Sequence, residues 1–349
     1  MARIGAVLLA AAMAVGTAPP AVAWAGAPPT GCGAYEVTDL RAADGWSEST
    51  SGFGVNNAGV VVGVTRPAYG VPTAFLWSSD VGLSTIEVPG ASYSAATDIN
   101  DRGQVVGEAT YPDGTTRPFV FDSRTGRTTD LGTLGGPEAY ATAINNRGQV
   151  VGASRTAAWE FQVHAFLWSP STGVMRDLGT LGGDDSQAFG INDHGQVVGR
   201  AMRAEGYHVP FVWEPRSGRM VQPSGEFAGG SAARGINNRG DMVGWAENGW
   251  QASSNQAFFR SARTRTVQAL TGVEEGGTRA VGITEDGTVV GMRFNDADGW
   301  FRTTVWHPAT GCVAELASPE VALVQVFGIS GNGHIVAGRM LWSPAAPRS

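Results

Sequence analysis

An internal repeat limits what this chain can fold into more than any other feature of its sequence. A phrase close to I-N-x-x-G-Q-V-V-G recurs seven times, and its turn glycines are Gly59, Gly103, Gly148, Gly195, Gly240, Gly287 and Gly333. Successive turn glycines are 44 to 47 residues apart. Self-similarity at such a period is typical of folds in which each repeat is one supersecondary unit.

Each repeat predicts four short strands. In the fourth repeat, a strand over 188–191 precedes the turn Asn-Asp-His-Gly, and strands over 196–199, 210–213 and 220–221 follow it. The asparagine can bond the backbone two residues on, and the glycine supplies a positive φ. Four strands per 40 to 50 residues are typical of a propeller blade. The sequence therefore predicts an all-β, seven-bladed β-propeller.

The two ends of the chain predict how this propeller closes. The segment 35–40 resembles the fourth strand of a repeat without the other three, and residues 326–337 supply a first and a second strand with little after them. We expect the N-terminal strand to complete the last blade, which would remove the exposed edges of an open array. Because residues 338–342 leave little room for a loop, the last blade is predicted to be truncated.

Composition excludes several classes of protein. The chain has 50 glycines and 18 prolines without a period of three, so it is not collagen-like. Its formal net charge of −7 argues against nucleic acid as a partner. All of its basic residues are arginines, which excludes Schiff-base and P-loop lysine chemistry.

Residues 1–25 have the features of a secretory signal peptide: an early Arg3, a short apolar run and small residues near 21–25. We therefore expect 26–349 to be a single secreted, extracellular and monomeric propeller domain with no membrane association after cleavage. In an oxidising compartment the two cysteines, Cys32 and Cys312, are expected to form a disulfide.

The phrase His-Ala-Phe-Leu-Trp at 164–168, together with D-L-G-T-L-G-G at 130–136 and 177–183, resembles the bacterial extracellular HAF repeat family. The resemblance covers nearly all of the chain after residue 25. It implies secretion and repetition, and it implies no catalytic residues.

The sequence offers no catalytic motif, and we expect no cofactor and no metal site. The chain lacks G-x-S-x-G, H-E-x-x-H and a Walker motif, and its five histidines fall at different repeat positions. Function in a repeat fold is expected where the repeats differ, here in the b–c loops, which join the second and third strands of each repeat. The candidate ligand-binding residues there are Tyr111, Asp113, Trp159, Glu160, Tyr207, Trp250 and Trp300.

Aromatic, amide and carboxylate side chains together suit a glycan, and they equally suit a protein partner. A third interpretation is that each aromatic side chain packs on its own loop. The sequence thus favours a secreted binding or scaffolding module. The alternative is a glycan hydrolase or lyase that uses two carboxylates on this face, which would have to lie about 5–10 Å apart. A purely structural surface protein is also open.

Overall fold

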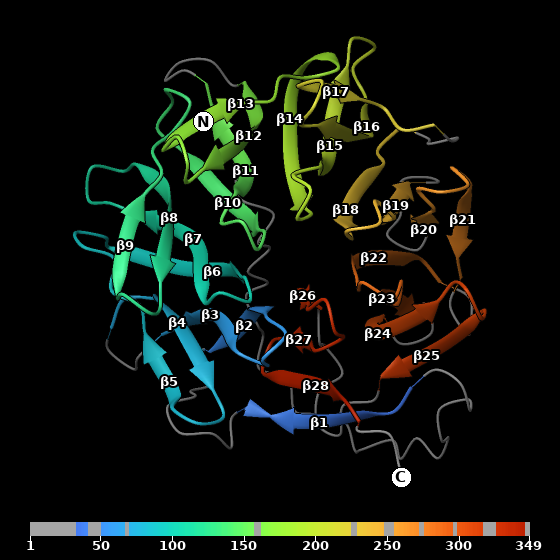
Figure 1. Ribbon diagram of the computed structural model, residues 1–349, viewed down its shortest axis with the longest axis horizontal. Coiled ribbons are helices and arrows are strands. Elements are labelled where there is room, and N and C mark those ends of the chain that lie inside the picture. Colours follow the sequence, from blue (N-terminus) through green and yellow to red (C-terminus); the bar gives the residue numbers. More distant parts are fainter. Residues whose placement is uncertain are drawn as a thin grey trace.

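The computed structural model describes residues 33–40, 50–66, 70–156, 162–224, 229–247, 255–271, 276–295, 299–316 and 326–345. In these ranges every helix or strand is a β-strand, which confirms the all-β prediction. Figure 1 shows the sheets arranged around a central axis, with the chain passing from one sheet to the next. No helix in the described ranges has the length and apolar character needed to cross a membrane.

The repeats form antiparallel groups of four consecutive strands. The first repeat consists of β2 (Ser51–Val55), β3 (Val61–Thr65), β4 (Thr73–Ser78) and β5 (Gly82–Thr85). The second consists of β6 (Tyr93–Ile99), β7 (Gln104–Thr110), β8 (Thr116–Asp122) and β9 (Arg127–Asp130). The fifth and sixth are β18 (Ala232–Ile236), β19 (Met242–Glu247), β20 (Asn255–Arg260) and β21 (Val267–Leu270), then β22 (Thr278–Ile283), β23 (Val289–Asn295), β24 (Trp300–His307) and β25 (Cys312–Leu316).

The third and fourth repeats share one eight-stranded sheet. Its strands are β10 (Ala139–Ile144), β11 (Val150–Arg155), β12 (Val163–Ser169), β13 (Val174–Asp177), β14 (Gly182–Ile191), β15 (Val197–Arg203), β16 (His208–Glu214) and β17 (Arg219–Val221). The two halves meet where β12 pairs in parallel with β14, through Val163 and Asp185.

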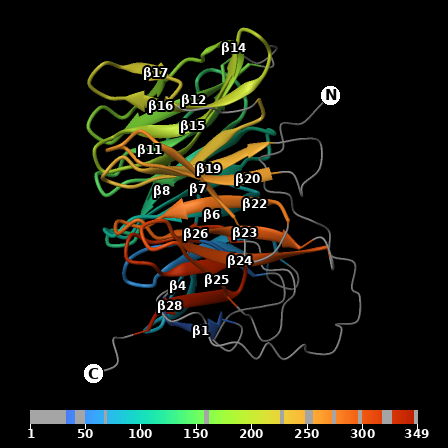
Figure 2. The same ribbon diagram turned by 90° about the vertical axis from the view of Figure 1, so that its right-hand side faces the viewer.

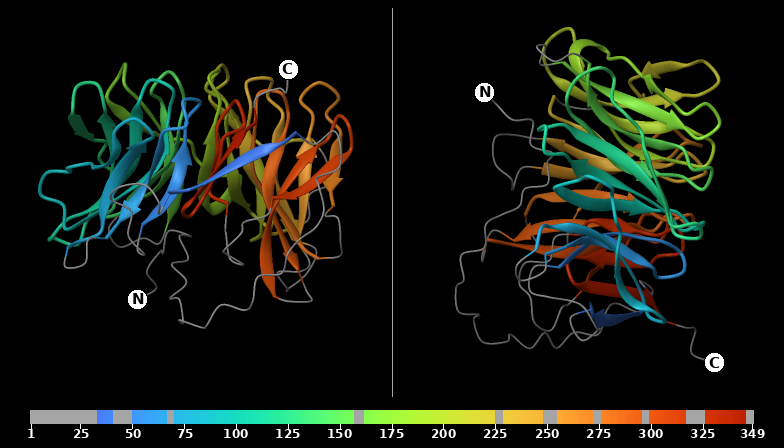
Figure 3. Two further views of the ribbon diagram at one scale, coloured as in Figure 1. Left: turned by 90° about the horizontal axis from the view of Figure 1, so that it is seen from below. Right: turned by 90° about the vertical axis from the view of Figure 1, so that its left-hand side faces the viewer.

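Strands from the two ends of the chain share the remaining sheet. Its order is β1 (Tyr35–Asp39), β28 (Met340–Pro344), β27 (Ile335–Ala337) and β26 (Gly328–Ile329). β1 and β28 lie side by side in Figure 2, and Figure 3 shows blue β1 beside the red C-terminal strands. The pairing of the N-terminal strand with the C-terminal strand is therefore as expected. The predicted truncation of this last group is wrong: its sheet has four strands, because β27 and β28 pair as a tight hairpin across the short link at Gly338 and Arg339.

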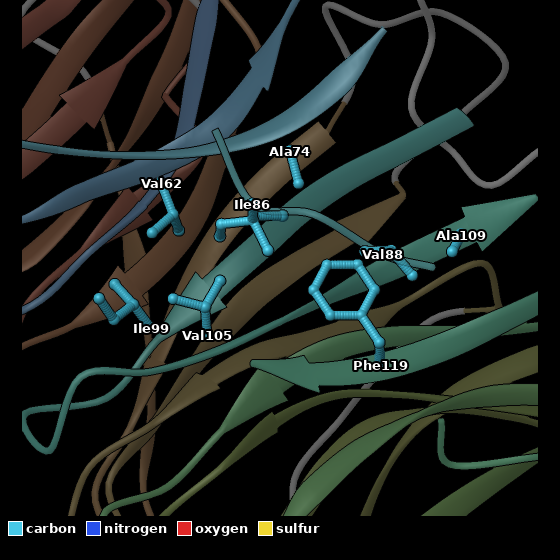
Figure 4. Close-up of a cluster of buried hydrophobic side chains, with 9 residues drawn as sticks. Val62, Ala74, Ile86, Val88, Ile99, Val105, Ala109 and Phe119 are labelled. Atoms are coloured by element: carbon cyan, nitrogen blue, oxygen red, sulfur yellow. The ribbon is translucent and has the colours of Figure 1, made fainter. Parts of the chain in front are cut away.

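The hydrophobic core lies between neighbouring sheets, where side chains from the facing surfaces of two sheets pack together. Figure 4 shows one such cluster, in which Val62 and Ile86 of the first repeat pack against Val105 and Phe119 of the second. The tryptophans of the third strands belong to the same kind of core. They are buried at Trp77, Trp168, Trp213 and Trp306.

The asparagine that opens each turn also joins one repeat to the next. Asn145 is buried, its Oδ1 accepts the backbone N–H groups of Arg147 and Gln149, and its Nδ2 donates to the carbonyl of Asn192 over 2.9 Å. The equivalent bonds between repeats run from Asn56 to Asn100, Asn100 to Asn145, Asn192 to Asn237 and Asn237 to Thr284. Burial favours these bonds, since an unpaired amide there would be costly.

A register shift recurs in the innermost strand of the first six repeats. In β10 the pairing with β11 skips from Ala141 to Ala143, as at a β-bulge, so Thr142 is left out of the strand register. The shift also explains the glycine of the second strand: a Cβ on Gly152 would overlap the carbonyl oxygen of Tyr140. Since bulges redirect a side chain, this shift decides what faces the axis. The skipped residues are Phe53, Thr97, Thr142, Phe189, Arg234 and Val281.

Candidate binding pocket at the axis

A pocket of about 200 Å³ lies on the axis, and we call it the axial pocket. Its wall contains all six of the skipped residues, together with Phe327. Each of these seven residues stands six positions before the turn glycine of its repeat. One repeat position therefore supplies phenylalanine, threonine, arginine and valine to a single cavity, which makes the wall chemically uneven.

The pocket lies toward the b–c loops. Its lining includes Ser154 and Arg155 at the end of β11 and Val163 at the start of β12, which flank the b–c loop of the third repeat. The turn asparagines are not among the lining residues. The axial pocket therefore belongs to the face on which the sequence predicted function, although it is built from inner strands and not from the loops.

One wall carries carboxyl groups from the second and third repeats. Glu108 on β7 is only 7% exposed, and its carboxyl makes no hydrogen bond or ion pair with any described residue. Burial raises the pKa of Glu108 to about 7. Glu138 differs, because its Oε2 accepts the Nε–H of Arg155 over 3.1 Å. Tyr140 also lines this wall, and burial, followed by the charges of Glu138 and Glu108, raises its pKa.

The fourth to sixth repeats contribute one cation to the described lining, Arg234. The guanidinium of Arg234 lies over the ring of Phe189, 4.6 Å from its centroid, and 5.7 Å from that of Trp245. Burial, and then the charges of Arg200 and Arg279, lower the pKa of Arg234 to about 10, so it stays charged at neutral pH. Its guanidinium forms no ion pair with a carboxylate of the described residues.

The pocket offers a ligand both a carboxyl group and a guanidinium cation. Glu108 holds a proton below about pH 7 and can then donate a hydrogen bond, while Arg234 presents a permanent cation across the same cavity. Phe53, Phe189 and Phe327 supply apolar surface between them. A site with a few convergent polar groups on an apolar lining is the usual form of a small-ligand site. Among the described residues, no group of three or more His, Cys, Asp or Glu side chains could hold a metal ion.

The structure places two of the predicted ligand residues in local contacts of the second repeat. The guanidinium of Arg117 lies over the ring of Tyr111, 4.1 Å from its centroid. Asp113 accepts the N–H and the hydroxyl of Thr115 through Oδ1, and the bond from that hydroxyl, with the backbone bond, lowers the pKa of Asp113. Both residues thus have a local role in their loop.

Among the described residues, Tyr207 and Trp300 do not line the axial pocket either. Tyr207 is 40% exposed, with Arg203 over its ring at 5.8 Å, and Trp300 pairs with Asn295 at the start of β24. Trp159, Glu160 and Trp250 lie outside the described residues, as does Cys32. The ligand role of all these side chains and the Cys32–Cys312 disulfide stay predictions.

Sequence reasoning missed the axial pocket, although a signal for it was present. The residue six positions before each turn glycine changes from Phe53 to Thr97 to Arg234, while its neighbours in the strand are mostly glycine or alanine. This variation at one position of an otherwise regular strand is the signal that could have identified the axial pocket.

Comparisons with known proteins support the fold and leave the activity open. A family model described as Protein of unknown function (DUF3466) matches residues 37–181. No curated protein matches the chain. Neither result is specific to the HAF repeat family.

Solved structures resemble this one as β-propellers. The β-propeller domain of the Trilobed protease from Pyrococcus furiosus is 12% identical, with a TM-score of 0.59 over 82% of this chain and 91% of that chain. A puromycin hydrolase mutant is 15% identical, with a TM-score of 0.56 over 86% of this chain and 51% of that chain. An acylaminoacyl peptidase is 12% identical, with a TM-score of 0.55 over 85% of this chain and 52% of that chain. At these identities the likeness shows a propeller-like fold alone.

Proposed function

We propose that the chain is a secreted seven-bladed β-propeller of the HAF repeat type, closed by β1, which acts as a glycan-binding module through its axial pocket. Seven repeats, the pairing of β1 with β28 and the bridge between Gly52 and Gly338 support the closed ring. The leader-like residues 1–25 support export.

The observation that carries the binding function is the unpaired polar chemistry of the pocket. A carboxyl as buried as that of Glu108 normally has a hydrogen-bond partner, and Glu108 has none among the described residues. A hydroxyl-rich ligand would supply that partner and would place its apolar faces on Phe53, Phe189 and Phe327. The pocket is smaller than the roughly 300–1,000 Å³ of many ligand sites, so we expect it to hold one sugar unit of a longer chain.

A glycan array with the purified protein tests this function, and a pocket-filling variant provides the control. Thr142→Phe puts into the third repeat the side chain that Phe53 and Phe189 place at the same position. Thr142→Val removes the same hydroxyl bonds, to the carbonyls of Val151 and Ala188, without filling the pocket. We expect Thr142→Phe to abolish binding and Thr142→Val to preserve it. Equal binding by both variants would place the ligand elsewhere.

A second candidate function is glycan cleavage, and the two carboxyls of one wall favour it. Glu108 holds a proton near neutral pH, as a general acid must, while the bond from Arg155 keeps Glu138 in contact with a cation. If any glycan that binds is also cleaved, Glu108→Gln should remove cleavage and preserve binding. Cleavage that persists in both Glu108→Gln and Glu138→Gln excludes this pair.

A further inference from the structure

Two further arginines lie close to Arg234, the cation of the fifth repeat that lines the axial pocket. Arg200 on β15 and Arg279 on β22 lie near Arg234, since the charge of each acts on its guanidinium. Arg279 also lies over the ring of Trp245, 5.5 Å from its centroid. Arg234 and Arg279 thus share the ring of Trp245, and of the three arginines Arg234 lines the pocket.

Little protein charge balances this cluster. The charge of Glu247 acts on Arg279, but no described carboxylate forms an ion pair with Arg200 or Arg234, and the Nε of Arg200 is buried without a hydrogen-bond partner. Cations that are partly removed from water are costly unless an anion pairs with them. An anion bound beside Arg234 would offset the repulsion among these cations.

The opposite wall limits which anion fits. Glu108 and Glu138 line the same cavity as Arg234, so a densely charged polyanion would meet repulsion there. A single carboxylate on an otherwise uncharged, hydroxyl-bearing body meets guanidinium at one end and carboxyl hydrogen bonding at the other. Arginine is well suited to a carboxylate, because its planar fork can donate two parallel hydrogen bonds.

We infer that the axial pocket recognises the carboxylate of a hexuronic acid unit, with Arg234 as its principal partner and Arg200 and Arg279 as supporting cations. This inference rests on the proposed glycan-binding function and names its ligand class. The sugar ring lies against Phe189, and its hydroxyls face Glu108.

Calorimetry with the full purified protein tests it, using oligogalacturonate and the matched neutral galactose oligomer. We expect the uronate to bind at least about 10-fold more tightly than the neutral sugar. Arg234→Thr should weaken uronate binding by about 10- to 100-fold and leave the neutral sugar unaffected. Thr97 and Thr142 show that the fold accepts threonine at this repeat position, and Arg127→Thr on exposed β9 is the charge-matched control.

The outcomes separate this inference from the function beneath it. Equal affinity for uronate and neutral sugar, with both abolished by Thr142→Phe, would exclude carboxylate recognition and would still support glycan binding in the pocket. Absence of binding by every saccharide would overturn both. Arg234-dependent binding of an acidic peptide in place of the uronate would show that the pocket recognises a carboxylate and that the ligand is not a sugar.

Discussion

The backbone N–H of Asn332 donates to the Oδ1 of Asn57 over 2.8 Å, although the two residues are 275 positions apart in the chain. The Nδ2 of Asn332 also donates to the carbonyl of Asn57 over 2.9 Å. The corresponding turns of the first two repeats are also bonded, since the N–H of Asn57 donates to the Oδ1 of Asp101. The last repeat therefore contacts the first through their turns, as the first contacts the second, which supports the proposed closure.

The seam at β1 should carry a large part of the stability. Leu40 is fully buried with Val336 and Leu341 of the last sheet and with Phe75 of the first repeat. We expect Leu40→Ala to lower the free energy of unfolding by about 2–5 kcal/mol in urea denaturation. Val37→Ala on the exposed side of the same strand should cost less than about 0.5 kcal/mol. An unchanged unfolding midpoint in Leu40→Ala would contradict a closed ring.

The glycine of the second strand should be required by the bulge that shapes the pocket. Gly152→Ala would place a Cβ against the carbonyl of Tyr140 and the ring of Phe166, so β10 must shift. We expect a loss of about 1–3 kcal/mol in the free energy of unfolding and a displaced Thr142. In the control, Gly331→Ala, the new Cβ meets only contacts of 3.4 Å or more. Similar losses in both variants would show that the bulge is not the cause.

The regular part of this fold could be predicted from the sequence because it is local. Turn chemistry at Asn192 and Gly195 and the alternation of short apolar runs define strands without any knowledge of their partners. The axial pocket depends instead on the register shift at Thr142, which is a property of two paired strands. Within the third repeat alone, Thr142 reads like its neighbours, and only the comparison of all seven repeats shows that its position varies.

The b–c loops mark a second limit of sequence reasoning. Tyr111 and Asp113 have the residue types of a glycan site, yet each has a partner within its own loop, Arg117 and Thr115 respectively. Residue type alone cannot separate a ligand contact from such a local contact. Arg234 and Glu108 line the pocket, but the sequence analysis did not select them. Each occurs in a single repeat, and the other repeats have different residues at the same position.

The ionisation of Glu108 predicts a pH-dependent stability. Its pKa is raised from 4.5 to about 7 by burial, so folding favours the protonated form. This cost is absent below about pH 4.5, grows as pH rises and is complete above about pH 7, where 2.5 pH units correspond to about 3 kcal/mol. Glu108→Gln should therefore match the parent protein at pH 4 and be more stable by up to about 3 kcal/mol at pH 8.

Urea denaturation at pH 4 and pH 8 measures this difference. Asp98, whose pKa burial also raises to about 7, contributes in the same direction and is present in both proteins, so its effect cancels. Glu87→Gln, at an exposed carboxyl, is the matched control for the substitution itself. A stabilisation by Glu108→Gln that is the same at pH 4 would assign the effect to packing and not to charge.

The two cysteines should join the ends of the chain. Cys312 is the first residue of β25, where it pairs with His307, while Cys32 stands three residues before β1. Leu316 at the other end of β25 and Tyr35 of β1 pack against one buried cluster, so these outer strands of neighbouring sheets approach each other. A bridge needs Cα atoms within about 7 Å, and a loop this long would constrain the unfolded chain by about 4–5 kcal/mol in the entropic model.

Thiol titration of the unreduced, denatured protein measures this bond. We expect no reactive thiol before reduction and two afterwards, and we expect reduction to lower the unfolding midpoint because the seam at β1 loses its covalent link. The double variant Cys32→Ser/Cys312→Ser should show the lower midpoint with or without reductant, which separates loss of the bond from other effects of the reductant. Two reactive thiols per chain without reductant would exclude the disulfide.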